Sequence, residues 1–242
     1  GVISKQQHGF LSRRSTTTNL LETLNDWTLS LKNKHSVTVA YIDYSKAFDT
    51  VSHPKLFQKL SGYGIDGCLL DWIKHLLTGR TQSSTRVGRS VSNPIPLTSG
   101  VIQGSCLGPL LFLLYINDVS SVFDSSGQCR LYADDLKLYT ELNASINNTS
   151  LQNNLAKLKD WSDTSQLHIS VTKCACMSRE TNRKSTAAVQ SSYKIGDQLI
   201  APVQSYSDLG VKFDSALSFQ DHISCLVTKA QRRIALLFRM FL

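Results

Sequence analysis

Residues 130–139 read RLYADDLKLY, and residues 37–43 read VTVAYID. The first stretch is β-prone on both sides of a polar pair, which predicts a β-hairpin that carries Asp134 and Asp135. The second is rich in β-branched residues and predicts a strand that ends at Asp43. Carboxylates embedded in apolar strands cost free energy unless something pairs them. The three aspartates therefore need a partner of opposite charge.

Helices alternate with short strands along the rest of the chain. Apolar residues at helical spacing predict helices over residues 15–34, 47–60, 66–77, 150–161 and 219–241, and an apolar helix that follows a Gly-rich turn within 100–123. Strand and turn residues predict a hairpin or loop over 81–98, a strand over 167–177, two or three short strands over 187–214, and a loop or subdomain boundary over 181–192. This pattern predicts an α+β fold.

Composition and charge narrow the class of protein. The chain has 242 residues and is 41% hydrophobic, enough for one sizeable core. Its 26 Lys and Arg against 18 Asp and Glu give a net charge of +8, which suits nucleic acid or an anionic membrane, although many soluble proteins are mildly basic. The six cysteines include no Cys-x-x-Cys pair and indicate reduced, intracellular thiols rather than a zinc site. The longest apolar run, residues 110–116, is far shorter than the roughly 20 residues of a membrane span.

A hard divalent cation is the partner that best suits the three aspartates. Mg²⁺ prefers oxygen ligands and commonly uses one or two carboxylates together with substrate phosphates. Two such ions, roughly 3.5–4 Å apart, stabilise the attacking and leaving oxygens of a phosphoryl displacement. Asp43, Asp134 and Asp135 are therefore candidates for nucleotidyl transfer with two Mg²⁺ ions, for which Mn²⁺ is a possible substitute. The alternative is that Asp43 caps a strand and that the Asp pair is a solvated turn.

Three longer motifs, each with its own spacing, follow one another along the chain. They are YIDYSKAFDTVSH (41–53), SGVIQGSCLGPLLFLLYINDV (99–119) and LYADDLKLY (131–139). In this order they resemble three successive palm motifs of reverse transcriptases, specifically those of the non-LTR, LINE-like retrotransposons. Three flanking stretches resemble, in turn, the segment before these motifs, the helix and strand after them, and the hairpin that leads into the thumb: QHGFLSRRSTTTNLL (7–21), LKDWSDTSQLHISVTKCACM (158–177) and SYSDLGVKFDSALSFQDHI (205–223).

The resemblance implies roles for the acidic residues and their neighbours. Asp43 would be the metal ligand of the first motif, and the backbone carbonyl of Tyr44 would help to hold the metal on the nucleotide side. Asp134 would be the second metal-binding carboxylate. Asp135 would be the neighbouring acid, which supports the primer end or the second metal. Because adjacent strand residues point to opposite faces, Asp134 and Asp135 would not be equivalent ligands. Tyr132 would lie near the primer terminus.

The resemblance also implies contacts with the incoming nucleotide. Phe48 stands where the family places a steric gate against the ribose 2′-hydroxyl, although a buried aromatic residue in the first helical turn would look the same. Gln103 and Gly104 match a turn that packs against the nucleotide and the template. Lys173 matches a lysine that neutralises or protonates the leaving pyrophosphate, with a solvated strand-edge lysine as the alternative. Ser170 departs from the Asn that the family usually has at this point.

Basic residues near both ends of the chain are candidates for nucleic-acid binding. Arg13 and Arg14 would contact template phosphates, which adds affinity that does not depend on sequence, or would be solvated surface residues. The basic residues of the last predicted helix would follow the duplex as a thumb does, or form only its wet face: Lys229, Arg232, Arg233 and Arg239. The expected partners are an RNA template, a DNA primer or target and dNTPs, with no membrane.

The resemblance predicts two parts, partial fingers and palm over residues 1–180 and the palm-end hairpin with the start of the thumb over 181–242. The leading function is an RNA-directed DNA polymerase. An RNA-dependent RNA polymerase is disfavoured by Phe48 and Ala133, since such enzymes often have a Gly-Asp-Asp hairpin and a smaller gate residue. A third possibility is a relic that only binds nucleic acid. We expect the rest of a retrotransposon polyprotein around this segment, poor synthesis by the segment alone, and, by analogy, a nuclear or cytoplasmic location.

Overall fold

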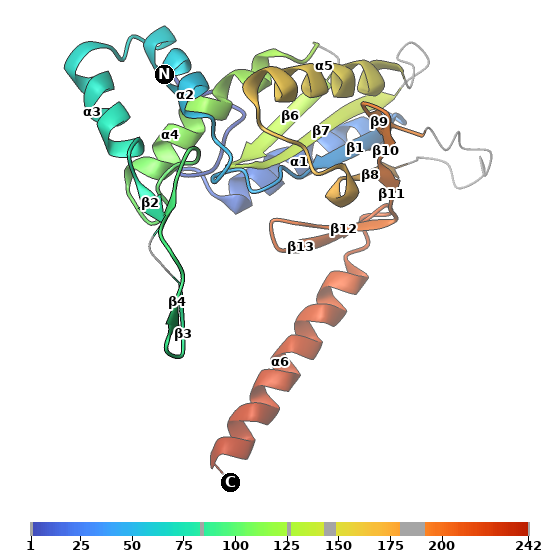
Figure 1. Cartoon of the computed structure of the whole chain (residues 1–242). Coiled ribbons are helices and arrows are strands. Elements are labelled where there is room, and N and C mark those ends of the chain that lie inside the picture. The colour runs from blue at the N-terminus through green and yellow to red at the C-terminus, as the bar shows by residue number, and fades with distance from the viewer. Residues whose placement is uncertain (1, 83–84, 125–126, 143–148, 180–191, 242) are drawn as a thin grey trace.

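A five-stranded sheet lies at the centre of the computed structural model, which describes residues 2–82, 85–124, 127–142, 149–179 and 192–241 (Figure 1). The strand order is β11-β8-β1-β7-β6. All neighbouring strands are antiparallel except β11, which runs parallel to β8. The strands span Ser36–Ile42 (β1), Gly127–Tyr132 (β6), Asp135–Leu142 (β7), Ala175–Arg179 (β8) and Ala201–Pro202 (β11).

The central strand β1 is buried on both faces because each face packs against other elements. Side chains alternate between the two faces of a strand. Ala40 and Ile42 belong to one apolar cluster, and Val37, Val39 and Tyr41 belong to the other. This explains why residues 37–42 are continuously buried rather than alternating between buried and exposed.

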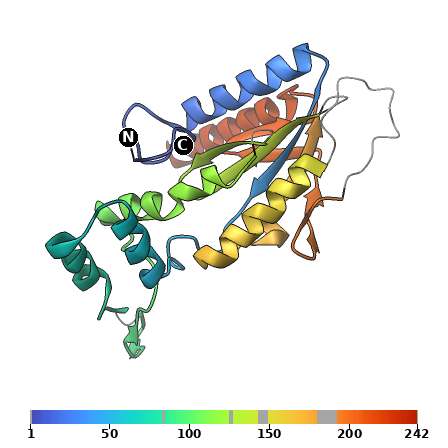
Figure 2. The ribbon, with the colours of Figure 1, turned by 90° about the horizontal axis from the view of Figure 1, so that it is seen from above.

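Four helices contribute to the apolar core on the first face of the sheet. They span His53–Gly62 (α2), Gly67–Leu77 (α3), Leu107–Ile116 (α4) and Thr149–Ser165 (α5). Helix α5 lies across the strands, whereas α4, α2 and α3 continue the core beyond the strand ends (Figure 2). Helix α4 is apolar almost all round, packs against α2 and is buried in the main apolar cluster, as expected of a core helix. A short 3-10 helix, Asn117–Ser121 (η1), extends it.

Helix α1, Thr16–Lys32, and the hairpin of β12, Ser205–Asp208, and β13, Val211–Asp214, cover the second face. The Trp27 ring of α1 contacts Tyr139 and Phe213 edge-on, with centroid distances of 6.0 and 5.8 Å. The buried Arg179 guanidinium lies 4.2 Å from the Trp27 ring centroid, where the π face stabilises its charge. This second core attaches α1 and the hairpin to the sheet.

The remaining elements project from this body. Helix α6, Gln220–Phe241, extends away from the sheet, and none of its residues is buried (Figure 1). The β3–β4 hairpin projects toward the same side in that view. The other short elements are β2 (Thr81–Gln82), β3 (Arg86–Val87), β4 (Ser90–Val91), β5 (Ile95–Pro96), β9 (Lys194–Ile195), β10 (Gln198–Leu199) and the 3-10 helix η2 (Val171–Lys173).

The structure confirms the α+β class, strand β1, the central hairpin and the last helix, and corrects two predicted elements. The helix predicted over 47–60 begins only at His53, because Pro54 favours the first turn of a helix and residues 47–50 form turns. The strand predicted over 167–177 begins only at Ala175. Residues 187–214 contain more short strands than the two or three expected, and residues 180–191 lie outside the described part. No helix in the described ranges is long and apolar enough to cross a membrane.

The segment before α1 attaches to the outer strand β6. The backbone N–H of His8 donates to the Leu131 carbonyl over 2.8 Å, and the N–H of Leu131 donates to the Gln6 carbonyl over 2.9 Å. Asn19 of α1 also donates from Nδ2 to the Leu131 carbonyl, over 3.0 Å. The start of the chain therefore lies beside the strand that leads into the central hairpin.

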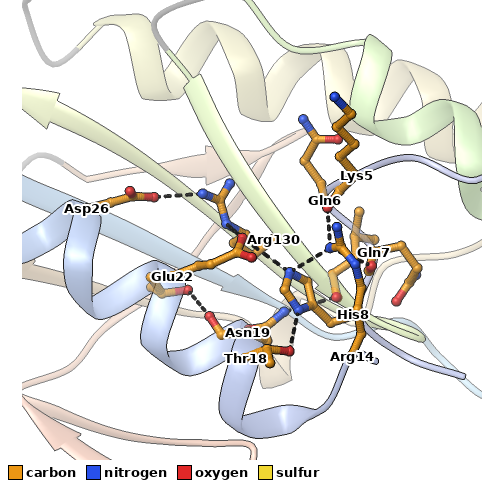
Figure 3. A network of polar contacts seen from close by, with 12 residues as sticks. Lys5, Gln6, Gln7, His8, Arg14, Thr18, Asn19, Glu22, Asp26 and Arg130 are labelled. Carbon is orange, nitrogen blue, oxygen red and sulfur yellow. Dashed lines mark hydrogen bonds and ion pairs between the residues drawn. The ribbon is translucent and has the colours of Figure 1, made fainter. Parts of the chain in front are cut away.

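Polar contacts, most of them partly buried, hold this segment, α1 and β6 together (Figure 3). The His8 ring is buried, with Nδ1 2.9 Å from Thr18 Oγ1 and Nε2 3.1 Å from Arg14 Nη1. A guanidinium only donates, so Nε2 is the acceptor in its contact with Arg14, and the same nitrogen lies 3.4 Å from Glu22 Oε2. Arg130 of β6 forms ion pairs with Glu22, at 3.3 Å, and Asp26, at 2.8 Å. Burial lowers the pKa of His8 below its usual 6.5, against the raising effect of the Glu22 charge.

The lowered pKa of His8 predicts a loss of stability in acid. The unfolded chain binds a proton at this histidine more readily than the folded chain, so the free energy of unfolding falls as the pH drops below about 6.5. Chemical denaturation at pH 7, 6 and 5 checks this. The His8→Gln variant should lose part of this acid dependence, whereas His75→Gln, which changes an exposed histidine, should keep it. Equal acid dependence in wild type and His8→Gln would contradict the assignment.

Leu138 of β7 is fully buried in the apolar core that the sheet forms with the helices on its first face. The Leu138→Ala variant should lower the free energy of unfolding by about 2–5 kcal/mol, because it leaves a cavity in the main core. Leu21→Ala, at a leucine of α1 that is 59% exposed, is the matched control and should cost far less. Denaturant titration measures both, and similar losses for the two variants would contradict the described core.

Candidate active site

The pairing of β1 with β7 brings two of the predicted aspartates together where β1 ends and β7 begins. Ile42 pairs with Leu136, and continuing this antiparallel register by one residue places Asp43 opposite Asp135. Directly opposite residues of an antiparallel pair share a face. Asp134 lies between β6 and β7, in the two-residue loop that it forms with Ala133. The predicted hairpin is thus confirmed, and its turn faces the end of β1.

The three carboxylates affect one another electrostatically. Desolvation raises the pKa of Asp135 to about 6, and the negative charges of Asp134, Asp208 and Asp43 add to this increase. Desolvation also raises the pKa of Asp134, with a further contribution from the charge of Asp43. A carboxylate whose pKa is raised by burial and by like charges is less stable in its charged form. The site therefore favours a bound positive charge.

Asp43 has one cationic neighbour within the described ranges, Lys173. The Lys173 Nζ lies 3.6 Å from Asp43 Oδ1. That oxygen is buried and accepts no hydrogen bond, although the side chain as a whole is 38% exposed. The Ser170 N–H donates to the Asp43 carbonyl over 2.8 Å, which holds the segment that precedes Lys173 against the end of β1. Lys173 therefore lies in η2 beside Asp43, whereas the strand predicted over 167–177 would have included it.

A divalent cation fits this arrangement of side chains. The buried Oδ1 of Asp43 accepts no hydrogen bond and has the Lys173 ammonium only at 3.6 Å, and the raised pKa values of Asp134 and Asp135 show carboxylates with too little compensating positive charge. Among the described residues, no three His, Cys, Asp or Glu side chains converge closely enough to hold a metal ion by themselves. Mg²⁺ commonly takes one or two carboxylates and completes its shell with water and substrate phosphates. The residues present match that kind of open site.

Phe48 lies half-buried beside the end of β1 and packs on two aromatic rings. Its ring stacks on Phe112 of α4, with centroids 4.2 Å apart, and meets the exposed Phe10 edge-on at 6.3 Å. The Val101 N–H donates to the Phe48 carbonyl over 2.9 Å. These contacts fix the ring position. Phe48 precedes α2 instead of lying in its first turn.

The loop that carries Gln103 and Gly104 docks on the turn that follows β1. Gln103 Nε2 donates to Asp49 Oδ1 over 2.6 Å. Gly104 has a φ of +80°, which favours glycine, and no atom lies within 4 Å of the place a Cβ would occupy. Gly100, which the sequence analysis did not single out, has a φ of +92°, and a Cβ there would lie 2.8 Å from the Asp49 carbonyl oxygen. Gly100 therefore permits the close contact between loop and turn.

The three predicted nucleic-acid contacts have different environments. Arg13 is exposed and has a φ of +62°. The Arg14 guanidinium instead binds backbone carbonyls of the N-terminal segment: Nη1 donates to the Lys5 carbonyl and, over 3.1 Å, to the Gln7 carbonyl. Tyr132 ends β6 and pairs with Asp135 across the hairpin. Arg14 thus has a structural role that the two expectations for it, phosphate contact or solvation, did not include.

A buried ion pair beside the site was also missed. Lys137 of β7 contacts Asp208 of the β12–β13 hairpin, and both side chains are almost fully buried. Burial lowers the pKa of Lys137, and the charge of Asp208 opposes this decrease. The stacked rings of Tyr41 and Tyr206, with centroids 3.9 Å apart, lie in the same contact. A lysine within the strand was the available signal, but its partner lies 71 positions away.

Comparisons with known proteins show which family the chain belongs to. The sequence profile of the family "Reverse transcriptase (RNA-dependent DNA polymerase)" matches residues 1–213. The "RNA-directed DNA polymerase from mobile element jockey" of Drosophila melanogaster is 29% identical over 241 residues, which cover 97% of this chain and 26% of that protein. The "Retrovirus-related Pol polyprotein from type-1 retrotransposable element R2" of Popillia japonica is 29% identical over 200 residues, which cover 76% of this chain and 32% of that protein.

Solved structures show the same fold. A telomerase from Candida albicans superposes with a TM-score of 0.57 at 14% identity, covering 84% of this chain and 33% of the telomerase chain. An apo telomerase from Candida tropicalis gives 0.59 at 11% identity, covering 89% and 40%. The chain spans about a quarter of the length of the jockey protein. Since the family profile covers most of the chain, this protein belongs to the reverse transcriptase (RNA-dependent DNA polymerase) family.

Proposed function

We propose that the chain is the polymerase core of a non-LTR retrotransposon protein and that it copies RNA into DNA by adding dNTPs to a primer 3′ end. The observation that carries the proposal is the grouping of Asp43, Asp134 and Asp135, whose negative charges lie close enough to raise the pKa values of Asp134 and Asp135. The jockey and R2 relatives support this choice over a different polymerase or a protein that only binds nucleic acid.

In this proposal Asp43, the Tyr44 carbonyl and Asp134 hold Mg²⁺, and Asp135 supports the second ion or the primer end. Two bound divalent ions supply charge neutralisation for the attacking and leaving oxygens in nucleotidyl transfer, and Mn²⁺ is a possible substitute. Lys173, whose side chain is 66% exposed, neutralises or protonates the leaving pyrophosphate. Its 3.6 Å distance to Asp43 supports this placement.

The nucleotide would be positioned by Phe48, Gln103 and Gly104. The packing of Phe48 on Phe112 gives a gate residue a fixed ring, which favours discrimination by shape. The open space over Gly104 leaves room for a ligand close to the backbone. The Gln103 amide, now bonded to Asp49, has the donor and the acceptor that a nucleotide contact needs.

Nucleic acid would bind along the same side of the molecule. In this proposal Arg13 contacts the template and Tyr132 contacts the primer terminus. Arg14 contributes its positive charge to the local electrostatic potential while its guanidinium stays bound to backbone carbonyls. The basic side chains of α6 would follow the duplex. The division into palm at 1–180 and thumb start at 181–242 stays a prediction, and β11 from the second part pairs with β8 of the first. A larger retrotransposon polyprotein in the nucleus or cytoplasm is the proposed context.

Replacing a metal-binding carboxylate tests the function directly. In the polymerase that carries this chain, Asp134→Asn should lower Mg²⁺-dependent DNA synthesis by ~10²-fold or more, because a group that stabilises transition-state charge is lost. RNA binding should change little, since Asp134 does not add to the basic surface. Primer extension and RNA-binding titrations measure the two effects.

The matched control for Asp134→Asn is Asp163→Asn, which removes an exposed carboxylate of α5 that pairs with Lys159. Exposed pairs of this kind contribute about 0–1 kcal/mol, so synthesis should be unchanged. Normal synthesis by Asp134→Asn would rule out the metal assignment. A wild-type protein that binds RNA but makes no DNA under any metal condition would favour the relic.

The steric gate gives a second test. Phe48→Val should raise the efficiency of rNTP incorporation relative to dNTP by about 10-fold or more, because the smaller side chain leaves room for the 2′-hydroxyl. Phe57→Val, at a half-buried phenylalanine of α2, is the control for lost aromatic volume. Single-nucleotide incorporation kinetics give the ratio, and equal ratios for the two variants would remove Phe48 from the gate.

A further inference from the structure

The turn that carries Asp134 contains a residue in an unfavourable backbone conformation. Ala133 has a φ of +56°, in the left-handed region where a Cβ is crowded and glycine is favoured. It is also buried. A non-glycine residue persists in this region only where its surroundings hold it. The conformation of Ala133 sets the direction in which the adjacent Asp134 leaves the turn.

The side-chain amide of Gln7 holds both backbone polar groups of Ala133. Gln7 Oε1 accepts from the Ala133 N–H over 2.8 Å, and Gln7 Nε2 donates to the Ala133 carbonyl over 3.2 Å. The same Oε1 accepts from the Gly9 N–H over 2.7 Å. Gln7 is 97% buried, with only 3% of its surface exposed. A buried side chain with such contacts has few other conformations, so the clamp on Ala133 is rigid.

The backbone around Gln7 approaches the turn so closely that only glycine fits next to it. A Cβ on Gly9 would lie 2.4 Å from the Ala133 nitrogen, a distance that no real contact allows. Arg14 Nη1 donates to the Gln7 carbonyl over 3.1 Å, and Arg14 is itself bonded to the buried His8 ring (Figure 3). The polar contacts between the N-terminal segment, α1 and β6 therefore hold the backbone of Gln7 in place.

We propose that Gln7 is a positioning residue for the polymerase reaction: its amide locks the Ala133 turn and so aims Asp134. The inference rests on the proposed function, because it assigns the purpose of the clamp to the carboxylate next to it. An amide is the side chain that suits the task, since it offers one acceptor and one donor to the N–H and carbonyl of a single residue. Ionised Glu lacks the donor, and Met lacks both groups.

The kinetic test compares two neighbouring glutamines. In the polymerase that carries this chain, Gln7→Met should lower kcat for dNTP incorporation by ~10–10²-fold, because misplacing a reacting group by about 1 Å costs on this order. The KM for dNTP should stay within about threefold, since the proposed nucleotide contacts lie on other elements. Gln6→Met is the matched control, because the Gln6 side chain contacts Ser4 and not the turn.

The Gln7→Glu variant tests whether the hydrogen bonds of Gln7 matter, or only the volume of its side chain. Its carboxylate keeps the acceptor for the Ala133 and Gly9 N–H groups but cannot donate to the Ala133 carbonyl. We expect a kcat between those of wild type and Gln7→Met. Gly9→Ala should lower kcat as well, because the added Cβ pushes the segment away from the Ala133 nitrogen.

Hydrogen exchange at the Ala133 amide tests the clamp without any activity. In wild type this turn amide should exchange at least ~10-fold more slowly than an unprotected peptide amide, because Gln7 binds it. Gln7→Met should raise its rate by a similar factor while the β1 amides keep their protection, which shows that the sheet stays folded. Gln6→Met should leave the rate at Ala133 unchanged.

Several results would overturn the proposal. They are free exchange of the Ala133 amide in wild type, an unchanged kcat in Gln7→Met, and equal losses in Gln6→Met and Gln7→Met. If Gln7→Met does not fold, the wild-type exchange rate and the kcat of Gln7→Glu decide. The Asp134→Asn variant distinguishes failure of the proposed function from failure of the role of Gln7. Normal synthesis in Asp134→Asn would contradict the proposed function. Lost synthesis in Asp134→Asn together with normal kinetics in Gln7→Met would contradict only the role of Gln7.

Discussion

The three carboxylates of the candidate site repel one another, and the rest of the fold has to hold them together against this repulsion. Asp43 and Asp135 meet because β1 and β7 pair antiparallel in a fixed register, and Asp134 joins them because the hairpin turn is only two residues long. A slip of one residue in this register would move one carboxylate to the other face of the sheet. The apolar clusters on both faces oppose such a slip, since it would also expose the side chains that form the cores. Packing of the cores thus holds together charges that would otherwise separate.

The surroundings of the site stabilise this arrangement in two ways. Lys173 places a positive charge 3.6 Å from Asp43, and Lys137 pairs with Asp208 in the adjacent contact between the sheet and the β12–β13 hairpin. On the opposite side, the N-terminal segment fixes the hairpin turn through Gln7. Each of these contacts joins segments that are far apart in the chain. The site is therefore a product of the whole fold, although its acids lie in two short motifs.

Local sequence patterns predicted what depends on neighbouring residues. The β-branched residues before Asp43 predicted β1, the apolar spacing predicted α1 and α6, and the polar pair between apolar residues predicted the central hairpin. The patterns failed where a distant contact decides. Residues 168–170 pair with the backbone after Asp43 instead of extending β8. Arg14 and Gln7 turn inward because β6 lies beside them, and nothing in residues 6–14 reveals that neighbour. The ordered motifs identified the family because their combination is specific, whereas single residues were ambiguous.

The central claim is that Asp43 and Asp134 form one divalent-cation site that the β1–β7 register assembles. Mn²⁺ titration followed by electron paramagnetic resonance, on the polymerase that carries this chain, tests it most directly. The account predicts saturable Mn²⁺ binding that Mg²⁺ displaces and that weakens by at least ~10-fold in both Asp43→Asn and Asp134→Asn, because each variant removes one of the few carboxylate ligands such a site has. Mn²⁺ binding in either variant as tight as in wild type would contradict the account.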